Sequence, residues 1–242
     1  MKITNRFNLP SGFVNLASEQ RAVVPKVYSV TTIMGPTRKI LLERRHHDEI
    51  ETDVADMINL IFGTAVHHIL EMHDKENMLE KRMNYEIRDG YMLSGQFDLY
   101  NKETATIEDY KTCKVWTINN DDFSSWKKQG LMYAWLARKH GLIVEHLRFH
   151  AIIKDWSAGN LKYKKNYPPH PIWTWEHHIT TADILDIEVW IRKRFDEIIF
   201  YENQSELPMC SEEERWGDKL CQDYCNAKNF CSYGKKLYGG IK

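Results

Sequence analysis

The chain has 242 residues, of which 43% are hydrophobic, so it is long enough for one good-sized buried core with or without an appendage. It contains no apolar run near the ~20 residues that a membrane-spanning helix requires, and residues 1–11 lack the apolar stretch of a secretory signal. We therefore expect a soluble intracellular protein. The formal net charge of −1 excludes a global basic field, so affinity for a polyanion must come from local clusters.

Residues 1–27 show no hydrophobic periodicity and are expected to lie irregularly along the surface. Order is predicted from Tyr28 onward, with Ser29 or Thr31 as a helix cap. Pro36 is typical of a first helical turn, and the helix would run through Leu41. This segment carries basic residues that would either contact phosphates or form an ordinary charged surface: Arg38, Lys39, Arg44 and Arg45.

The apolar run 57–62 leads into a predicted helix that contains Gly63, His67 and His68. Glycine in a helix interior costs about 1 kcal/mol relative to alanine, which suggests that another backbone approaches closely at Gly63. His67 is either a metal ligand through a neutral ring nitrogen or a core histidine with a satisfied hydrogen bond.

Two strands, 84–88 and 91–99, are predicted around Asp89-Gly90, a pair typical of a tight hairpin. Asp98 lies near the end of the second strand. The next predicted strand, 105–110, contains Asp109, and Lys111 shares its face because alternate side chains of a strand point the same way. Two carboxylates and an ammonium suit a divalent cation such as Mg²⁺ and an attacking water. The alternative is a solvated charged pair on a surface strand.

A helix over 126–136 places Gln129 and Tyr133 on one face. Gln129 among aromatic residues needs hydrogen-bond partners, which the strand edge carrying the acids or a nucleic-acid backbone would supply; the alternative is an ordinary amphipathic helix. Further strands are predicted at 147–153 and 173–179, with a polar excursion between them. Thr180-x-x-Asp183 resembles a capping box that opens a long helix.

Lysines form local clusters that are candidate contacts for DNA, although each would otherwise be solvated surface. The clusters are Lys111 with Lys114, Lys127 with Lys128, and Lys162 with Lys164 and Lys165.

The last 33 residues contain four of the five cysteines: Cys210, Cys221, Cys225 and Cys231. Clustered cysteines in a cytosolic protein indicate a metal rather than disulfides. Three interpretations stay open at this point: a [4Fe–4S] cluster, a tetrahedral zinc, or no metal, with the thiols packed as small apolar side chains. Cys113 stands apart, just beyond Lys111.

The order of these motifs along the chain resembles that of a known protein family. Gly63-x-x-x-His67 is followed by Gly95-x-x-Asp98, Asp109-x-Lys111 and Gln129-x-x-x-Tyr133, and this order resembles the RecB-like branch of the PD-(D/E)XK nuclease superfamily over roughly residues 28–140. The resemblance implies a mixed α/β fold: a restriction-endonuclease-like core with a central mixed β-sheet flanked by helices. We expect a nuclease domain over 1–205 and a helical, cysteine-containing appendage over 206–242 that packs on it.

The resemblance also implies roles for individual residues. His67, Asp98, Asp109 and the backbone carbonyl of Tyr110 would bind Mg²⁺ or Mn²⁺, Lys111 would be the catalytic lysine, and Gln129 and Tyr133 would support the site and contact DNA, with Lys114 beside them. Several relatives bind a [4Fe–4S] cluster with one cysteine from before the first motif. This chain has none before Cys113, so it departs from that pattern.

The implied function is a metal-dependent DNA exonuclease that leaves 5′-phosphates and acts in phage-type recombination, replication or repair. A histidine in the first motif is associated with exonucleases in that family. The alternatives are a structure-specific endonuclease or nickase on the same site, and a non-catalytic DNA-binding module. The expected partners are single-stranded DNA or duplex DNA with ends, together with recombination or single-strand-binding proteins. The expected location is the cytoplasm, or the host cytoplasm for a viral protein.

Overall fold

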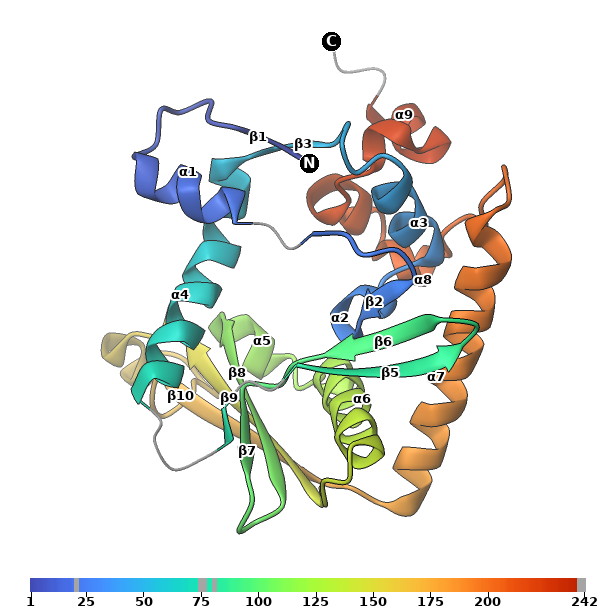
Figure 1. Ribbon diagram of the computed structural model, residues 1–242. Coiled ribbons are helices and arrows are strands. Elements are labelled where there is room, and N and C mark those ends of the chain that lie inside the picture. Colours follow the sequence, from blue (N-terminus) through green and yellow to red (C-terminus); the bar gives the residue numbers. More distant parts are fainter. Residues whose placement is uncertain (20–21, 74–77, 80–81, 239–242) are drawn as a thin grey trace. The chain divides into compact units, whose positions relative to one another are not determined.

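The computed structural model describes residues 1–19, 22–73, 78–79 and 82–238 (Figure 1). The chain divides into two compact units, one formed by Met1–Phe62 with Lys193–Lys242 and the other by Gly63–Arg192. Two helices continue through the points of division, α4 (Ile58–His73) and α7 (Thr181–Glu202). Within the described residues, no helix combines the length and the apolar character that crossing a membrane requires.

A mixed sheet organises the unit Gly63–Arg192. Among the described residues it has five strands in the order β10–β9–β8–β7–β4. The strands β8 and β9 are parallel, and the other neighbours are antiparallel. Their bounds are β4 Met78–Leu79, β7 Leu99–Asn101, β8 Thr106–Cys113, β9 His146–Ile153 and β10 Ile172–His178. The predicted fold class, a central mixed sheet flanked by helices, is confirmed.

The connection between the two parallel strands is helical, as a parallel pair requires. It consists of α5 (Val115–Asn119) and α6 (Ser124–Lys139). A Cβ atom at Gly130 of α6 would lie 2.7 Å from Leu147 Cδ1 and 3.1 Å from the Phe149 ring, so glycine lets α6 lie against β9 without displacing these side chains. The helix α6 therefore covers the sheet face that carries Phe149 and, beside it in register, Asp109.

The predicted hairpin at Asp89-Gly90 is confirmed. It joins β5 (Met83–Arg88) to β6 (Tyr91–Gly95), and both turn residues have positive φ angles, 51° and 79°. This is the combination that a two-residue type I′ turn demands. The single strand predicted over 91–99 is wrong, because β6 ends at Gly95 and Leu99 begins β7 in the five-stranded sheet. Asp98 lies in the break between them.

The long helix α7 begins with the predicted capping box. The Thr180 hydroxyl accepts from Asp183 N (3.1 Å), and the Asp183 carboxylate accepts from Thr180 N (2.9 Å). One turn further on, Glu188 of α7 accepts hydrogen bonds from Trp135 Nε1 (2.8 Å) and Lys139 Nζ (3.2 Å) of α6. These contacts connect α7 to the helix that covers the site face of the sheet.

The unit formed by the two chain ends is not irregular at its start, contrary to expectation. β1 (Lys2–Thr4) pairs in parallel with β3 (Glu51–Asp53), and α1 (Ser11–Ser18) follows β1. The pairing brings together segments about fifty residues apart, which local periodicity cannot reveal. The remaining early elements are β2 (Val27–Ser29), α2 (Val30–Ile33), α3 (Thr37–Arg45) and a short 3₁₀ turn over Val54–Met57. Ser29 caps α2 by accepting from Thr32 N at 3.1 Å, as one of the two predicted caps.

The cysteine-containing tail packs on α3 within this unit. Leu42 of α3, Ile50 and Ala227 form a buried cluster, with Phe230 packed against it. The tail contains short helical elements: α8 (Glu212–Arg215), a π turn over Leu220–Tyr224, a 3₁₀ turn over Lys228–Phe230, and α9 (Ser232–Tyr238). A division of the chain at residue 205 stays a prediction.

Candidate active site

The break between β6 and β7 places Asp98 against the edge of β8. β7 pairs with β8 only as far as Leu99 opposite Glu108, so the backbone of Tyr110 lies beyond the end of β7. Asp98 Oδ2 accepts a 2.7 Å hydrogen bond from Tyr110 N and takes the place of the missing strand. The N–H and the carbonyl of one strand residue point to the same side, so the Tyr110 carbonyl is directed to this edge as well.

His67 of α4 reaches the same carboxylate. Its Nδ1 lies 3.1 Å from Asp98 Oδ1, and its ring meets the Tyr110 ring edge-on at 6.2 Å. The hydrogen bond to Asp98 raises the pKa of His67, and burial opposes that rise. The neighbouring His68 is exposed. Of the two adjacent histidines, the structure brings His67 to the acids.

Asp109 and Lys111 form a buried pair on the face that α6 covers. Asp109 is 3% exposed, and its Oδ2 lies 2.5 Å from Lys111 Nζ. Burial raises the pKa of Asp109, with the nearby Asp98 charge acting in the same direction and the Lys111 ammonium opposing it. Within the described residues, no donor other than the Lys111 ammonium reaches the buried Oδ2.

These residues fit a divalent cation by their chemistry. Two carboxylates, one imidazole and a carbonyl directed to the same edge form the oxygen-rich set that Mg²⁺ and Mn²⁺ prefer, and the buried Asp109 carboxylate already has the Lys111 ammonium as its partner. In the described parts of the chain no three histidine, cysteine or acidic side chains already surround a common point. Asp98 is directed to His67 and Asp109 to Lys111, so binding a cation requires these side chains to exchange partners.

The predicted substrate-binding residues differ in the contacts that they make near this site. Gln129 Nε2 donates to Tyr133 OH at 3.1 Å, so the two share a face of α6 as predicted, but no hydrogen bond described for Gln129 reaches the acids. Lys114 is exposed immediately after the end of β8. Lys127 pairs with Asp183 at 2.9 Å, and Lys128 lies 3.6 Å from the centre of the Trp190 ring. Both of these lysines serve internal contacts.

The basic residues of α3 also make internal contacts. Arg44 lies over the Tyr28 ring at 3.7 Å, Arg45 donates to backbone carbonyls of the segment 201–204, and Lys39 pairs with Glu43 at 2.9 Å. Arg38 donates to Leu207 O at 2.8 Å. The four basic side chains of α3 therefore hold parts of this unit together in the structure. A role in binding phosphates stays a prediction.

Sequence reasoning did not single out a buried acid on the opposite face of β8. Glu108 is 7% exposed and accepts from His150 Nε2 (2.6 Å) and Arg148 Nη1 (3.1 Å) of β9. Burial favours a higher pKa for Glu108, but these two partners together lower it. The centre of the His150 ring also lies 5.7 Å from that of the Tyr110 ring. The Glu108–His150 pair therefore packs against Tyr110, whose backbone N–H bonds Asp98. Side chains alternate along β9, so Arg148 and His150 share a face, and His150 pairs in register with Tyr110. This alternation was the feature of the sequence that could have indicated partners for Glu108.

The expectation of a backbone packed against Gly63 is wrong. A Cβ atom there would meet only the Thr112 hydroxyl, at an ordinary 3.6 Å. The glycine that a close approach requires is Gly130, in the later motif.

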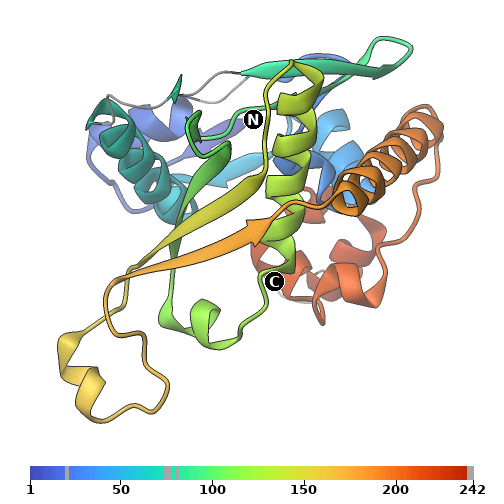
Figure 2. The ribbon, with the colours of Figure 1, turned by 90° about the horizontal axis from the view of Figure 1, so that it is seen from below.

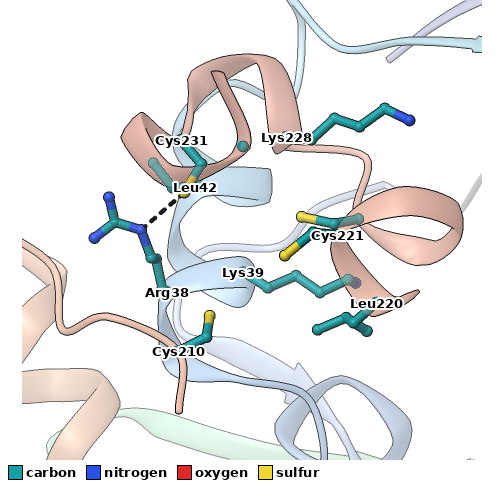
Figure 3. Close-up of a pocket in the computed structure, with 10 residues that line it drawn as sticks. Arg38, Lys39, Leu42, Cys210, Leu220, Cys221, Lys228 and Cys231 are labelled. Carbon is teal, nitrogen blue, oxygen red and sulfur yellow. Dashed lines mark hydrogen bonds between the residues drawn. The ribbon is translucent and has the colours of Figure 1, made fainter. Parts of the chain in front are cut away.

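The four tail cysteines line one cavity of about 20 Å³ between the tail and α3 (Figure 3). Arg38, Lys39 and Lys228 line the same cavity, and Arg38 Nε lies 3.1 Å from Cys231 Sγ. Burial raises the pKa of Cys210 to about 11 and also raises the pKa of Cys221 and Cys225. Burial acts the same way on Cys231, but the Gly234 backbone N–H and Arg38 outweigh it and lower its pKa.

Cys113 is separate from this set. It is buried in a cluster with Ala151 and Ile153 of the sheet.

Comparison with known proteins gives limited information. No sequence profile of a known family matches the chain, and no curated protein matches it. The solved structure of SSO0001 is similar, with a TM-score of 0.60 and 16% identity over 92% of this chain and 93% of that one. An alkaline exonuclease from Laribacter hongkongensis gives a TM-score of 0.47 at 12% identity, covering 81% of this chain and 95% of that one. A phage-related exonuclease from Haemophilus somnus 129PT gives 0.32 at 11%, covering 69% and 74%. The first likeness shows a shared fold, and the other two scores are too low to support an argument.

Proposed function

We propose that the protein is a divalent-metal-dependent DNA nuclease of the PD-(D/E)XK type, acting as an exonuclease. One observation carries the proposal. A break between two strands delivers Asp98 to the edge of β8, where His67 contacts it. The Asp109–Lys111 pair lies on the same strand β8, and the four residues follow the motif order of that superfamily. An acid–acid–lysine set gathered around a strand edge has no obvious use in a protein that only binds DNA.

Each residue has a definite role in this proposal. His67, Asp98, Asp109 and the Tyr110 carbonyl would hold Mg²⁺ or Mn²⁺. When bound, such a cation neutralises the charge that develops on a cleaved phosphodiester. The Lys111 ammonium, released from Asp109 when that carboxylate turns to the cation, would donate a hydrogen bond that orients the attacking water, and the water's proton would pass to solvent. In-line attack leaves a 5′-phosphate and a 3′-hydroxyl.

The test uses purified protein with Mg²⁺ or Mn²⁺ and three DNAs of one sequence: a linear single strand, a linear duplex and a closed circular single strand. We expect release of 5′-phosphorylated products from a linear substrate and resistance of the circle. Rapid cutting of the circle would favour the structure-specific endonuclease. Binding of all three without cleavage in either metal would favour the non-catalytic module.

We further propose that Cys210, Cys221, Cys225 and Cys231 bind one metal centre, a [4Fe–4S] cluster or a zinc ion. The supporting observation is that all four line a single cavity beside three basic side chains, which would offset the negative charge of metal-bound thiolates. The set lies entirely in the tail, so it does not need the earlier cysteine that the related nucleases use. The metal would stabilise a segment with few buried apolar residues of its own.

Metal analysis of the purified protein distinguishes these possibilities. A cluster gives a brown protein absorbing near ~400 nm when it is purified without oxygen, and zinc gives a colourless one with about one equivalent of metal. Cys225→Ser should lose the metal and loosen the tail, whereas Cys113→Ser should keep it. Metal-free protein with a protease-resistant tail would support simple packing of the thiols.

A further inference from the structure

The segment between β9 and β10 is a basic and mostly exposed stretch of the unit Gly63–Arg192. Residues 154–171 contain four lysines and one aspartate, in a chain whose net charge is −1. At its tip, Lys162, Lys164 and Lys165 surround Tyr163, whose side chain is 86% exposed. In Figure 2 this segment is drawn in yellow and projects beyond the ends of the strands.

The segment has a defined conformation. Trp156 Nε1 donates to Pro168 O at 2.9 Å, and Tyr167 OH accepts from Ser157 N at 2.8 Å. A 3₁₀ turn, η2 (Ala158–Lys162), shapes the approach to the tip. Trp156 also packs on the buried cluster that contains Cys113 and Ile153. The base of the loop is therefore packed against the sheet, and hydrogen bonds within the loop fix the conformation from which the tip extends.

The same segment is tied to the strand that carries the candidate catalytic pair. Lys154 N donates to Cys113 O at 2.9 Å, and Val115 N donates to Asp155 Oδ1 at 2.7 Å. Because β8 and β9 run in parallel with Lys111 beside Ala151, the loop leaves the sheet at the end toward which Lys111 lies. Lys114 and Trp116, which is 70% exposed, emerge from the same end.

Three other lysines near the site already contact acidic or aromatic side chains. Lys111 pairs with Asp109, Lys127 with Asp183, and Lys128 lies over Trp190. Within the described residues, Lys162, Lys165 and Lys114 form no salt bridge, so their charges face solvent. An exposed tyrosine among such lysines combines a stacking surface with phosphate contacts, the pairing by which proteins hold unpaired nucleic acid without reading its sequence.

We infer that the β9–β10 loop, with Lys114 and Trp116, binds a single-stranded stretch of DNA next to the active site. Lys114, Lys162, Lys164 and Lys165 contact phosphates, and Tyr163 and Trp116 stack on bases. This inference rests on the proposed nuclease function for its substrate, but binding is measured separately from cleavage. A duplex offers no exposed base faces to the two aromatic rings, so the loop prefers an unpaired strand.

The test measures binding of a fluorescent 20-nucleotide single strand, and of a blunt duplex of the same length, to protein carrying Asp109→Asn to suppress cleavage. Three sets of changes are compared: the triple variant Lys162→Ala, Lys164→Ala, Lys165→Ala; the single variant Tyr163→Ala; and the control Lys102→Ala. Lys102 is an exposed lysine in the turn between β7 and β8, at the other end of β8. Thermal melting of each variant verifies the fold.

We expect the triple variant to lose single-strand affinity by at least about tenfold and to reduce the slope of log affinity against log salt by about 2, as three lost phosphate contacts imply. Tyr163→Ala should lose about tenfold with an unchanged salt slope, because stacking is not ionic. Lys102→Ala should match its parent. Equal affinity of the triple variant and the control would overturn the inference, as would a loss confined to the duplex. If the wild type cuts no DNA but these losses are still observed, the nuclease assignment fails while the binding surface stands.

Discussion

The carboxylate of Asp98 accepts a 2.7 Å hydrogen bond from the backbone N–H of Tyr110, one residue beyond Asp109. This bond takes the place of ladder hydrogen bonds that β7 would have made had it continued. Because β7 begins only at Leu99, the edge of β8 at Tyr110 has no strand partner from β7, and Asp98, just before β7, binds that edge instead. The first three predictions concern the residues around this bond.

Removing one candidate ligand should remove activity without unfolding the protein. Asp109→Asn should reduce cleavage below detection in Mg²⁺ and abolish the heat of Mn²⁺ binding in calorimetry, because the cation loses a charged ligand. Asp98→Asn should do the same. Glu103→Gln, an exposed acid in the β7–β8 turn, is the matched control and should behave as the wild type. Wild-type turnover by either aspartate variant would show that the metal binds elsewhere.

Lys111 should affect chemistry rather than metal binding. Lys111→Ala should lower kcat on the order of 10²–10³-fold, since a positioned donor is removed from the transition state. Mn²⁺ affinity should stay equal or increase, because the competing ammonium 2.5 Å from Asp109 Oδ2 is gone. Calorimetry checks affinity and single-turnover cleavage checks the rate. Loss of Mn²⁺ binding would make Lys111 a structural residue.

The two adjacent histidines should differ. His67→Ala should weaken Mn²⁺ binding by about tenfold or more, because His67 Nδ1 lies 3.1 Å from Asp98 and the ring both orients that carboxylate and offers a ligand. His68→Ala should change it little, since His68 is exposed on the same helix. Equal effects of the two substitutions would contradict the assignment.

Gly130 should matter for stability. Gly130→Ala would place a methyl group 2.7 Å from Leu147 Cδ1 and 3.1 Å from the Phe149 ring, so these buried side chains or α6 itself must shift. We expect a loss of about 1–3 kcal/mol in the free energy of unfolding, measured by urea titration. Gly12→Ala is the control, since no atom lies within 4 Å of that added methyl, and it should change stability by less than about 1 kcal/mol. Equal stability of the Gly130 variant and wild type would refute the close packing.

The contact between α6 and α7 should be sensitive to acid. Hydrogen bonds from Trp135 and Arg192, with help from Lys139, lower the pKa of Glu188 from 4.5 to about 2. A lowered folded-state pKa adds stability above the unfolded value and loses it as pH falls through the folded value. The stability advantage of wild type over Glu188→Gln should therefore be full above pH 5 and shrink between about 4.5 and 2, as followed by denaturant titration at each pH. A constant difference would show that the charge is not involved.

Local signals in the sequence predicted local structure well. The Asp89-Gly90 turn, the Thr180 capping box and the helix carrying Gln129 all depend on neighbouring residues and are confirmed. The break at Gln96–Asp98 was missed because the residues on either side continue a strand-like pattern, while the two strands belong to different pairings. The same limit hid the parallel pairing of β1 with β3.

The geometry of the candidate site could not be predicted from the sequence. The family resemblance makes His67 and Asp98 candidate ligands of one cation, but it does not reveal that Asp98 bonds the Tyr110 backbone or that Asp109 is almost completely buried. Glu108 was missed because its partners His150 and Arg148 come from another strand. Such partners depend on sheet order, which a single sequence does not encode locally.

The unit built from both chain ends has a consequence for biosynthesis. Leu42 and Ile50 share a buried cluster with Ala227, so this core closes only after the segment that carries Ala227 has been made. The continuous unit Gly63–Arg192 has no such delay, and its sheet is available to fold while the C-terminus is still being synthesised. A translation product interrupted before Ala227 would therefore have the sheet that carries the candidate site but leave α3 uncovered, with apolar surface that invites aggregation and proteolysis.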